Sequence, residues 1–386
     1  MWPGSPLERR LAERLAAWSR AGLRRTRRTP DGVDLSSNDY LQLARHPDVV
    51  RAFARGALEE GVGSSGSRLL RGERTIFDAV EQRVAAWKGS DRALFFSSGY
   101  LANLAVLTTL TERDDLIISD ALNHASLIDG ARLAPARREI LPHADLDALE
   151  TRLRQADGPG VRFVVTESVF SMDGDLAPLR ELVALCHRYG AVPVVDEAHA
   201  CGLYGDHGSG RLEAAGVDPR TCISINTAGK ALGVSGAFVT GPSAVIEMLT
   251  QRARPFVFST APPPAVAHAI AASLDLVARE PDRRATVAAL ARYLRGRLRA
   301  HGVTVPADGS QIIPIHVGAN GAAVRLAARL SADGFDVRAI RPPTVPDGTA
   351  RLRISVNAGL DVPTLDRFAA AVAEARQEVS CAAASS

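Results

Sequence analysis

Lysine is almost absent from this chain of 386 residues. Lysine and arginine together number 46, and only Lys88 and Lys230 are lysine, so arginine supplies nearly all the positive charge. A guanidinium stays protonated and cannot form a Schiff base, whereas a primary amine can. Lys230 follows the small residues Thr227-Ala228-Gly229. We interpret it as a candidate covalent residue, the alternative being an ordinary surface lysine.

Cysteine, net charge and long apolar runs are also scarce. The four cysteines form no CxxC pair, which gives no sign of a disulfide framework or a zinc site. A net charge of +3 does not favour nucleic-acid binding, and we interpret the one short basic run, Arg24 to Arg28, mainly as a solvated loop. No apolar run could span a bilayer, and arginines near the N-terminus argue against a signal peptide. We therefore expect a cytoplasmic protein.

The most informative stretch runs from Val192 to Gly241. Val192, Val194 and Val195 form a short β-branched run that ends in Asp196, as in a fully buried strand. His199 follows in a glycine-rich segment. Ligands of open α/β sheets collect at the carboxyl ends of the strands, so these side chains are candidates for a site.

Asp196 and Lys230 together indicate pyridoxal phosphate (PLP). This cofactor needs an amine for its aldehyde and a carboxylate facing its ring nitrogen. The carboxylate keeps the nitrogen protonated, so that the ring can accept electrons from a carbanion.

Strands and helices alternate with short turns, which predicts an α/β fold with a mostly parallel sheet. After about residue 281 the pattern changes to a second block, whose last strand, Ala350–Val356, alternates polar and apolar residues as if covered on one face. We expect an N-terminal helix and connecting segment over 1–45, a large cofactor-binding domain over 46–280 and a small domain over 281–386.

Two glycine-rich turns could bind anions. The pattern of Ala93–Phe96 predicts a strand, and Ser97-Ser98-Gly99 and a helix follow it. Free N–H groups at the start of that helix could hold the cofactor phosphate. The alternative is an ordinary helix start without a ligand.

Gly61, Gly63 and Gly66 form a literal GxGxxG. A helix-like segment precedes it, where a dinucleotide fold needs a strand, so we reject a nicotinamide site.

Several segments resemble the α-oxoamine synthases, PLP enzymes of the fold-type-I aminotransferase superfamily. They are SSNDYL at Ser36, GSSGSRLLRG at Gly63, NHAS at Asn123, TESVFSMDGD at Thr166, DEAHACGLYGDHGSG at Asp196, NTAGKALGVSGAFV at Asn226 and ARLRISVNAG at Ala350. The resemblance covers nearly the whole chain. Gln42 stands where the family usually has glycine. The resemblance implies a fold-type-I, aminotransferase-like α/β fold, with a smaller α+β C-terminal domain, and a homodimer.

The resemblance also implies a set of site residues. Lys230, His124, Asp196 and His199 would be catalytic, with His124 stacked on the cofactor ring. The cofactor would be held by these four and by Ser98, Gly99, Tyr100, Ser171, Thr227 and Thr260, the last reaching the neighbouring subunit's phosphate. The substrates would contact Arg24, Asn38, Glu167, Arg341 and Arg353. No metal site is predicted.

The implied reaction is the condensation of L-alanine with a pimeloyl thioester, of CoA or of a carrier protein, with loss of CO2. Arg353 would pair with the amino acid carboxylate, and Arg341 with the terminal carboxylate of the acyl chain, for which Arg24 is the second candidate. Alternatives are glycine with acetyl-CoA or succinyl-CoA, or serine with a fatty acyl-CoA. A non-catalytic regulatory module is a further alternative, against which Asp196, His199, Lys230 and Arg353 all argue.

Overall fold

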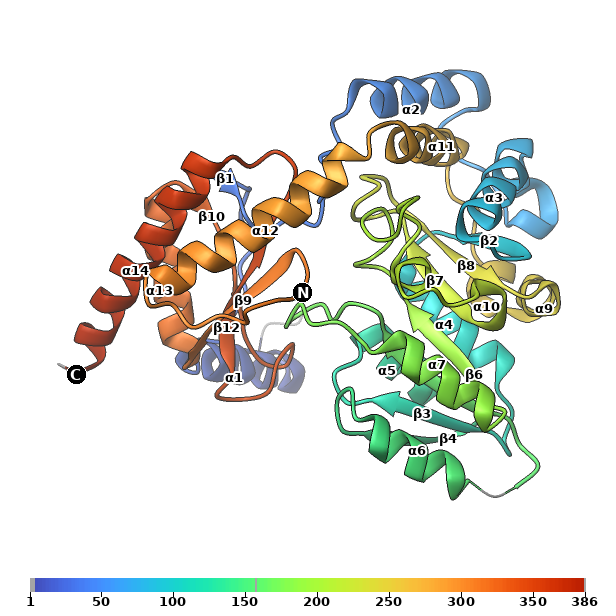
Figure 1. The fold of residues 1–386 in the computed structure, drawn as a ribbon, viewed down its shortest axis with the longest axis horizontal. Helices are drawn as coiled ribbons and strands as arrows, with labels where there is room; N and C mark the ends of the chain where they lie inside the picture. The colour runs from blue at the N-terminus through green and yellow to red at the C-terminus, as the bar shows by residue number, and fades with distance from the viewer. Residues whose placement is uncertain (1–3, 157, 385–386) are drawn as a thin grey trace. The chain divides into compact units, whose positions relative to one another are not determined.

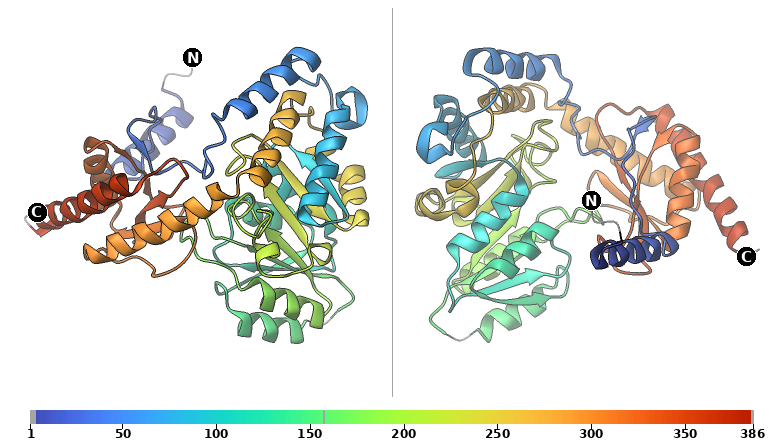
Figure 2. Two further views of the ribbon diagram at one scale, coloured as in Figure 1. Left: turned by 45° about the horizontal axis from the view of Figure 1, so that its top comes forward. Right: turned by 180° about the vertical axis from the view of Figure 1, so that it is seen from behind.

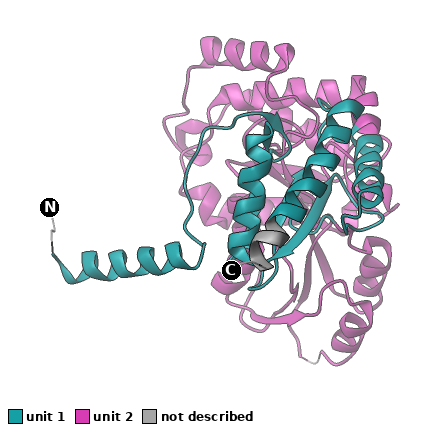
Figure 3. Ribbon diagram, turned by 90° about the vertical axis from the view of Figure 1, so that its left-hand side faces the viewer, with its two compact units in different colours: residues 1–37, 172–174, 287–386 teal, residues 38–171, 175–286 magenta. Residues whose placement is uncertain are grey.

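The computed structural model describes residues 4–156 and 158–384 and divides into two compact units (Figures 1 and 3). Unit 1 comprises residues 1–37, 172–174 and 287–386, and unit 2 comprises residues 38–171 and 175–286. The domain boundaries expected at 45 and 280 stay a prediction. Within the described ranges, no helix is long and apolar enough to cross a membrane.

Unit 2 is built on a seven-stranded sheet in the order β2-β8-β7-β6-β5-β3-β4. The five strands β3 to β7 run parallel, and β8 is antiparallel to both β7 and β2. The strands are β2 (Arg92–Phe96), β3 (Leu116–Asp120), β4 (Arg137–Leu141), β5 (Arg162–Glu167), β6 (Val192–Asp196), β7 (Ile223–Thr227) and β8 (Ala237–Gly241). This is the mostly parallel sheet that the alternation of elements predicts.

The register of this sheet gathers polar residues at one edge. Glu167 pairs with Asp196 between β5 and β6, and Asp196 pairs with Ile225 between β6 and β7. Because these strands are parallel, their carboxyl ends meet at the same edge, where ligands of such sheets bind.

Helices cover both faces of the sheet, as the two views in Figure 2 show. One apolar core includes Val106, Leu107 and Leu127 from α4 and α5, and the other includes Leu149 and Leu182 from α6 and α7. Burial on both faces explains why the strands read as continuous apolar runs. The helices of this unit are α2 (Pro47–Glu60), η1 (Arg68–Gly72), α3 (Thr75–Lys88), α4 (Gly99–Leu110), α5 (Ala125–Leu133), α6 (Leu146–Arg154), α7 (Leu179–Arg188), α8 (Arg211–Ala214), η2 (Pro219–Thr221), α9 (Ser243–Arg252), α10 (Arg254–Val257) and α11 (Pro264–Arg279).

Unit 1 has an antiparallel sheet, β11-β12-β9, and a parallel pair, β1-β10. Its core includes Leu294, Ile313, Ile354 and Phe368. The elements are α1 (Pro6–Arg20), β1 (Val33–Asp34), β9 (Ile312–Gly318), α13 (Asn320–Ala332), β10 (Phe335–Asp336), β11 (Ala339–Ile340), β12 (Ala350–Ser355) and α14 (Val362–Ala384), with α12 (Asp282–Ala300) beginning in unit 2 and continuing in unit 1.

Gln42 adopts the backbone conformation that glycine favours. Its φ is 56°, in the left-handed region that most side chains avoid. Asp39 holds the turn, since its Oδ1 accepts from Leu43 N at 2.9 Å and its carbonyl accepts from Gln42 Nε2 at 3.2 Å. The backbone therefore keeps a glycine-like shape although the glycine itself is absent.

Candidate active site

Lys230 lies at the start of a chain of polar contacts in unit 2. Its Nζ is 2.7 Å from His199 Nε2, and His199 Nδ1 is 2.7 Å from the hydroxyl of Tyr40. The Tyr40 hydroxyl donates in turn to Asn38 Oδ1 at 3.0 Å. If Lys230 donates to Nε2, the Nδ1–H can donate to the Tyr40 oxygen, so the tyrosine selects one tautomer of the histidine.

Asp196 is buried at the carboxyl end of β6 and is held by two N–H donors. Its Oδ2 accepts from Asn103 Nδ2 at 2.7 Å, and its Oδ1 accepts from the amide of Ala198 at 2.8 Å. N–H donors favour the ionised form of a carboxyl group. An ionised carboxylate here can pair with a protonated ring nitrogen.

A relay of side chains connects Asp196 to His124. Asn103 Nδ2 also donates to Ser126 Oγ at 2.9 Å, and Ser126 Oγ lies 2.7 Å from His124 Nδ1. Burial lowers the pKa of His124, and Lys230 lowers it further, whereas Asp196 opposes the shift. A neutral imidazole at pH 7 suits the stacking role that the family resemblance implies.

Glu167 lies beside Asp196 at the same edge of the sheet. Its side chain is buried, and its Oε1 has no hydrogen-bond partner among the described residues. Burial, with repulsion from Asp196, raises the pKa of Glu167 well above its usual value, although Lys230 opposes this. Two adjacent buried carboxylates repel each other, so this environment favours the protonated form of Glu167.

Two of the residues predicted to hold the cofactor, Gly99 and Thr227, lie close together. Ser98 Oγ caps α4 by accepting from Leu101 N at 3.3 Å, and a Cβ added at Gly99 would lie 3.8 Å from Thr227 Oγ1. The start of α4 and Thr227 thus lie side by side, where N–H groups of the helix start could bind a phosphate. The Thr227 hydroxyl itself donates to Gly236 O at 3.2 Å and accepts from Gly229 N at 3.1 Å. The next residue, Tyr100, donates from its hydroxyl to Asp129, which raises the pKa of Tyr100.

Ser171 and Thr260, also predicted to hold the cofactor, lie on other segments of unit 2. Ser171 is buried, and its backbone N–H donates to Glu167. Thr260 is exposed, next to Ala261, whose amide donates to Gly66 O at 2.8 Å. The glycine- and serine-rich segment at 63–72 therefore lies against the Thr260 turn, and it follows helix α2 rather than a strand, as expected.

The donor set fits PLP. The site offers an amine, a buried carboxylate, a flat neutral imidazole and a helix start with no Cβ at Gly99, and the unpartnered Glu167 Oε1 can contact a bound molecule. The aldehyde, the ring nitrogen, the ring face and the phosphate of the cofactor each have a counterpart of suitable chemistry.

Three predicted substrate residues belong to unit 1. Arg24 and Arg341 line one cavity of about 310 Å³, together with Arg25, Arg28 and apolar residues of α13 that include Val324 and Ala327. Burial lowers the pKa of Arg341, and repulsion from Arg25 adds to this, so the guanidinium favours an anion nearby. Arg353 lies buried in β12, where its Nη1 donates to Ser355 Oγ at 2.8 Å.

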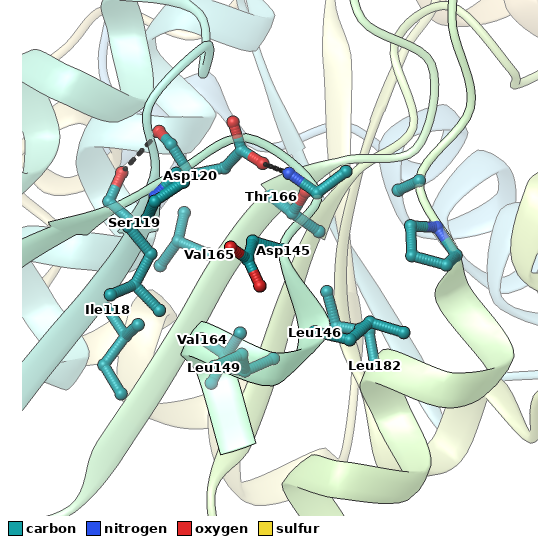
Figure 4. A pocket seen from close by; sticks show the side chains of 15 residues that line it. Ile118, Ser119, Asp120, Asp145, Leu146, Leu149, Val164, Val165, Thr166 and Leu182 are labelled. Carbon is teal, nitrogen blue, oxygen red and sulfur yellow. Dashed lines mark hydrogen bonds between the residues drawn. The ribbon is translucent and has the colours of Figure 1, made fainter. Parts of the chain in front are cut away.

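A separate, small cavity in unit 2 has no part in this site. Figure 4 shows it on the face of the sheet that α6 and α7 cover, lined by Ile118, Val164, Leu149 and Asp145 among others. Its volume of about 30 Å³ holds a few water molecules at most and is too small for a cofactor.

Sequence reasoning missed Tyr40, Asn103 and Ser126, which orient the predicted residues. Asn103 had a signal, because it is the one amide side chain in the mostly apolar helix Gly99–Leu110. Tyr40 and Ser126 lie inside the segments SSNDYL and NHAS. The signal for them was position within a motif, without an indication of what they contact.

Known proteins resemble this chain over most of its length. Residues 30–372 match the family model for class I and II aminotransferases. Proteins named 8-amino-7-oxononanoate synthase from Burkholderia pseudomallei (strain 1710b) and Burkholderia mallei (strain SAVP1) are each 47% identical over 381 residues, covering 94% of this chain and 96% of the relative.

Solved structures show the same fold. Serine palmitoyltransferase from Sphingomonas wittichii has a TM-score of 0.90 at 31% identity and covers 98% of both chains. An 8-amino-7-oxononanoate synthase from Francisella tularensis has a TM-score of 0.78 at 28% identity, covering 90% of this chain and 98% of that one. A serine palmitoyltransferase from S. paucimobilis, solved with bound PLP and myriocin, reaches 0.91 at 28% identity, covering 98% of this chain and all of that one.

The chain therefore belongs to the PLP-dependent class I and II aminotransferase family, with its fold-type-I architecture. Within it, the chain belongs to the 8-amino-7-oxononanoate synthases, which are acyltransferases of the α-oxoamine synthase group. The family, the fold class and the cofactor predicted from the sequence motifs are confirmed.

Proposed function

We propose that the protein catalyses the decarboxylative condensation of L-alanine with a pimeloyl thioester, releasing 8-amino-7-oxononanoate, CO2 and CoA or a carrier protein, as a step of biotin synthesis. The observation that carries the proposal is the amine of Lys230, 2.7 Å from His199, at a sheet edge that also holds the buried carboxylate of Asp196. The names of the relatives support these substrates.

Lys230, His199 and Tyr40 form the proton-handling part of the site. PLP, when bound, supplies an electron sink for the electron pair of the substrate α-carbon. Lys230 removes the α-proton, which requires the neutral amine. His199 contacts that amine and is itself oriented by Tyr40, so its imidazole fixes where the amine points.

Asp196 and Glu167 have different roles in the proposed site. Asp196, held by Asn103 and Ala198, would face the ring nitrogen of bound PLP, and its carboxylate would keep that nitrogen protonated. Burial and the neighbouring Asp196 raise the pKa of Glu167, and its unpartnered Oε1 would be available to a bound substrate.

Arginines determine which acids are accepted. Arg353 binds the carboxylate of the amino acid in a bidentate manner. Arg24 and Arg341 bind the terminal carboxylate of the acyl chain, and the apolar residues Val324 and Ala327 of the same cavity suit its methylene groups. A fatty acyl chain has no second carboxylate, so these arginines favour a pimeloyl donor over the donor of a serine palmitoyltransferase.

The active form is a homodimer in this proposal. Large apolar side chains stand exposed near Thr260 and the glycine-rich segment: Val62 is 85%, Leu70 83% and Phe258 72% exposed. Exposed apolar side chains that cluster mark protein interfaces. A second copy of the chain would cover them and receive the Thr260 hydroxyl.

The substrates can be tested by offering the PLP-loaded protein alanine, glycine or serine with pimeloyl-CoA, acetyl-CoA or palmitoyl-CoA, while CoA release is followed. We expect the highest kcat/KM for alanine with pimeloyl-CoA. Arg341→Ala should raise KM for pimeloyl-CoA by roughly tenfold to a hundredfold, the equivalent of one charge-assisted hydrogen bond. KM for heptanoyl-CoA, which lacks the carboxylate, should hardly change. A wild-type preference for acetyl-CoA or palmitoyl-CoA would refute the proposal.

A further inference from the structure

The second lysine of the chain is buried in an ion pair close to the active site. Lys88 is the last residue of α3, and its Nζ contacts Glu197 Oε2. The two side chains are 1% and 0% exposed. Lys88 Nζ also donates to Ser209 O at 2.6 Å, and Glu197 Oε1 accepts from the amide of Leu212 at 2.9 Å. Both charges are therefore fully enclosed and hydrogen-bonded.

Glu197 is continuous with the catalytic turn. It follows Asp196 directly and precedes His199 by two residues. Its amide donates to Ile225 O on β7 at 2.8 Å, and its carbonyl accepts from Ala200 and Cys201 at 2.9 and 2.8 Å. The backbone that carries Asp196 and His199 is thus fixed at Glu197, by main-chain bonds and by the ion pair.

The surrounding loop is shaped around this carboxylate. A Cβ added at Gly210 would lie 2.6 and 2.7 Å from the two carboxylate oxygens, closer than any side chain could approach. The pair also joins three segments, the end of α3, the turn after β6 and the start of α8. A lysine here acts as a compact charge, in a chain that uses arginine elsewhere.

Burial of a charge pair rarely adds to stability. Apolar residues of similar volume often serve as well or better, whereas removal of one partner leaves an unpaired buried charge. A buried pair next to a catalytic turn therefore calls for an explanation other than stability alone.

We propose that Lys88 and Glu197 are positioning residues, which fix the 196–199 turn so that the Asp196 carboxylate and the His199 ring keep the geometry PLP needs. Neither residue contacts substrate or cofactor. The proposal rests on the proposed function only in placing the cofactor at Asp196, His199 and Lys230, and it is independent of which acyl donor is used.

The test compares PLP-loaded wild type with Lys88→Met, Glu197→Gln and the double variant Lys88→Met/Glu197→Leu. Three properties are measured: Tm, the dissociation constant for PLP, and the pH titration of the visible absorption band of the bound cofactor. The matched control is Glu81→Gln, which breaks another buried pair of unit 2, that with Arg68, about two turns before Lys88 on α3.

We expect both single variants to bind PLP more weakly, on the order of tenfold, as when residues that orient a metal ligand are removed. Their visible band should also titrate at a shifted pH. The double variant, which leaves no unpaired charge, should recover Tm toward wild type while the weak binding and the shifted titration persist. Glu81→Gln should lower Tm without moving the titration.

Two results would overturn the proposal. One is a double variant with recovered Tm that also binds PLP and titrates as wild type does. The other is a Lys88→Met variant that loses Tm alone; Glu197→Gln, the milder change, decides the matter if Lys88→Met does not fold. No thioester is used in this test, so it does not depend on the proposed reaction. If the proposed reaction were wrong, wild type would still bind PLP but would release no CoA, and the two outcomes can be told apart.

Discussion

At the scale of single residues, most side chains that would do chemistry are held by others that do none. Tyr40 orients His199, and Asn103 serves both Asp196 and the relay to His124. Such support fixes the geometry on which rate depends, since a displacement of about 1 Å can cost a hundredfold. The sequence motifs predicted the chemical residues, while their supports became visible only through contacts.

Gln42 offers a test of backbone strain. A non-glycine residue in the left-handed region costs roughly 1 kcal/mol. Gln42→Gly should therefore raise the free energy of unfolding by about 0.5–1 kcal/mol in urea denaturation, the gain being reduced by the greater freedom of glycine in the unfolded chain. Gln42→Ala, which loses the Nε2 contact and keeps the strain, is the control and should not stabilise. Equal effects of the two changes would contradict this explanation.

His143 bridges two carboxylates in unit 2. Its Nδ1 is 2.9 Å from Asp120 and its Nε2 is 2.6 Å from Asp175, and the ring lies edge-on to Phe170 at 4.3 Å. The hydrogen bonds to Asp120 and Asp175 raise the pKa of His143 from 6.5 to about 10. The folded protein therefore keeps this ring charged at neutral pH.

Stability should depend on pH through this ring. Because the folded-state pKa lies above the unfolded value, the contribution is complete below about pH 6.5 and is lost as pH rises through about 10. His143→Gln should cost about 2 kcal/mol at pH 6, a value kept modest because the side chain is 26% exposed, and progressively less toward pH 10. Urea titrations at several pH values measure the difference, with the exposed His301→Gln as control. A difference that does not change with pH would show that the charge has no such role.

At the scale of elements, apolar runs and caps predicted most strands and helices of unit 2. The strands β5, β6 and β7 are covered on both faces, so their apolar runs are unbroken. In unit 1, Ser5 caps α1, its Oγ accepting from Glu8 N at 3.1 Å. Local signals of this kind depend on near neighbours in the chain, which the sequence contains.

The prediction for the last strand was wrong in part. Alternation of polar and apolar residues in 350–356 predicted a strand covered on one face, yet all six residues of β12 are buried. The strand lies in the middle of its sheet, where Arg351 pairs with Asp173 and Arg353 donates to Ser355. Buried polar side chains that have ion-pair or hydrogen-bond partners give the same alternating pattern in the sequence as an exposed face does, and only the contacts reveal the difference.

Helix α4 contributes Asn103, the main donor to Asp196. Asn103→Ala should slow the exchange of the alanine Cα hydrogen with solvent, measured with PLP and no thioester, by roughly tenfold to a hundredfold, since a hydrogen bond to a charged group is removed. Asn226→Ala removes another buried amide, which bonds to Ser224 and Thr240, and should leave the exchange rate near wild type. If both variants slow exchange equally, the effect of Asn103 is on packing alone.

At the scale of the whole molecule, the pairing of distant segments could not be predicted. Val33 of β1 pairs with Phe335 of β10, so N-terminal residues share a unit with the C-terminal ones. No local pattern records a partner 300 residues away. The gathering of Arg24 with Arg341 around one cavity follows from the same pairing and was expected only from the family resemblance.

The proposed homodimer leads to a prediction at this scale. Sedimentation should show a dimer that Leu70→Asp weakens, because a charge would be placed in the covered apolar surface. Ile140→Asp is the control, because Ile140 is also exposed, on the edge strand β4, and this change should leave the dimer intact. A fully active wild-type monomer would refute the dimer.

The central claim is that Lys230 is the residue that binds PLP covalently, and the scarcity of lysine makes it directly measurable. Borohydride reduction of the PLP-loaded protein should fix the cofactor by reducing its carbon–nitrogen bond to the lysine, and peptide mass spectrometry then locates it. The chain has only two candidate side chains, of which Lys88 is enclosed in its ion pair with Glu197. We predict the added mass on the peptide that contains Lys230 and none on the peptide that contains Lys88. Modification of Lys88, or of neither lysine in protein saturated with PLP, would contradict the assignment.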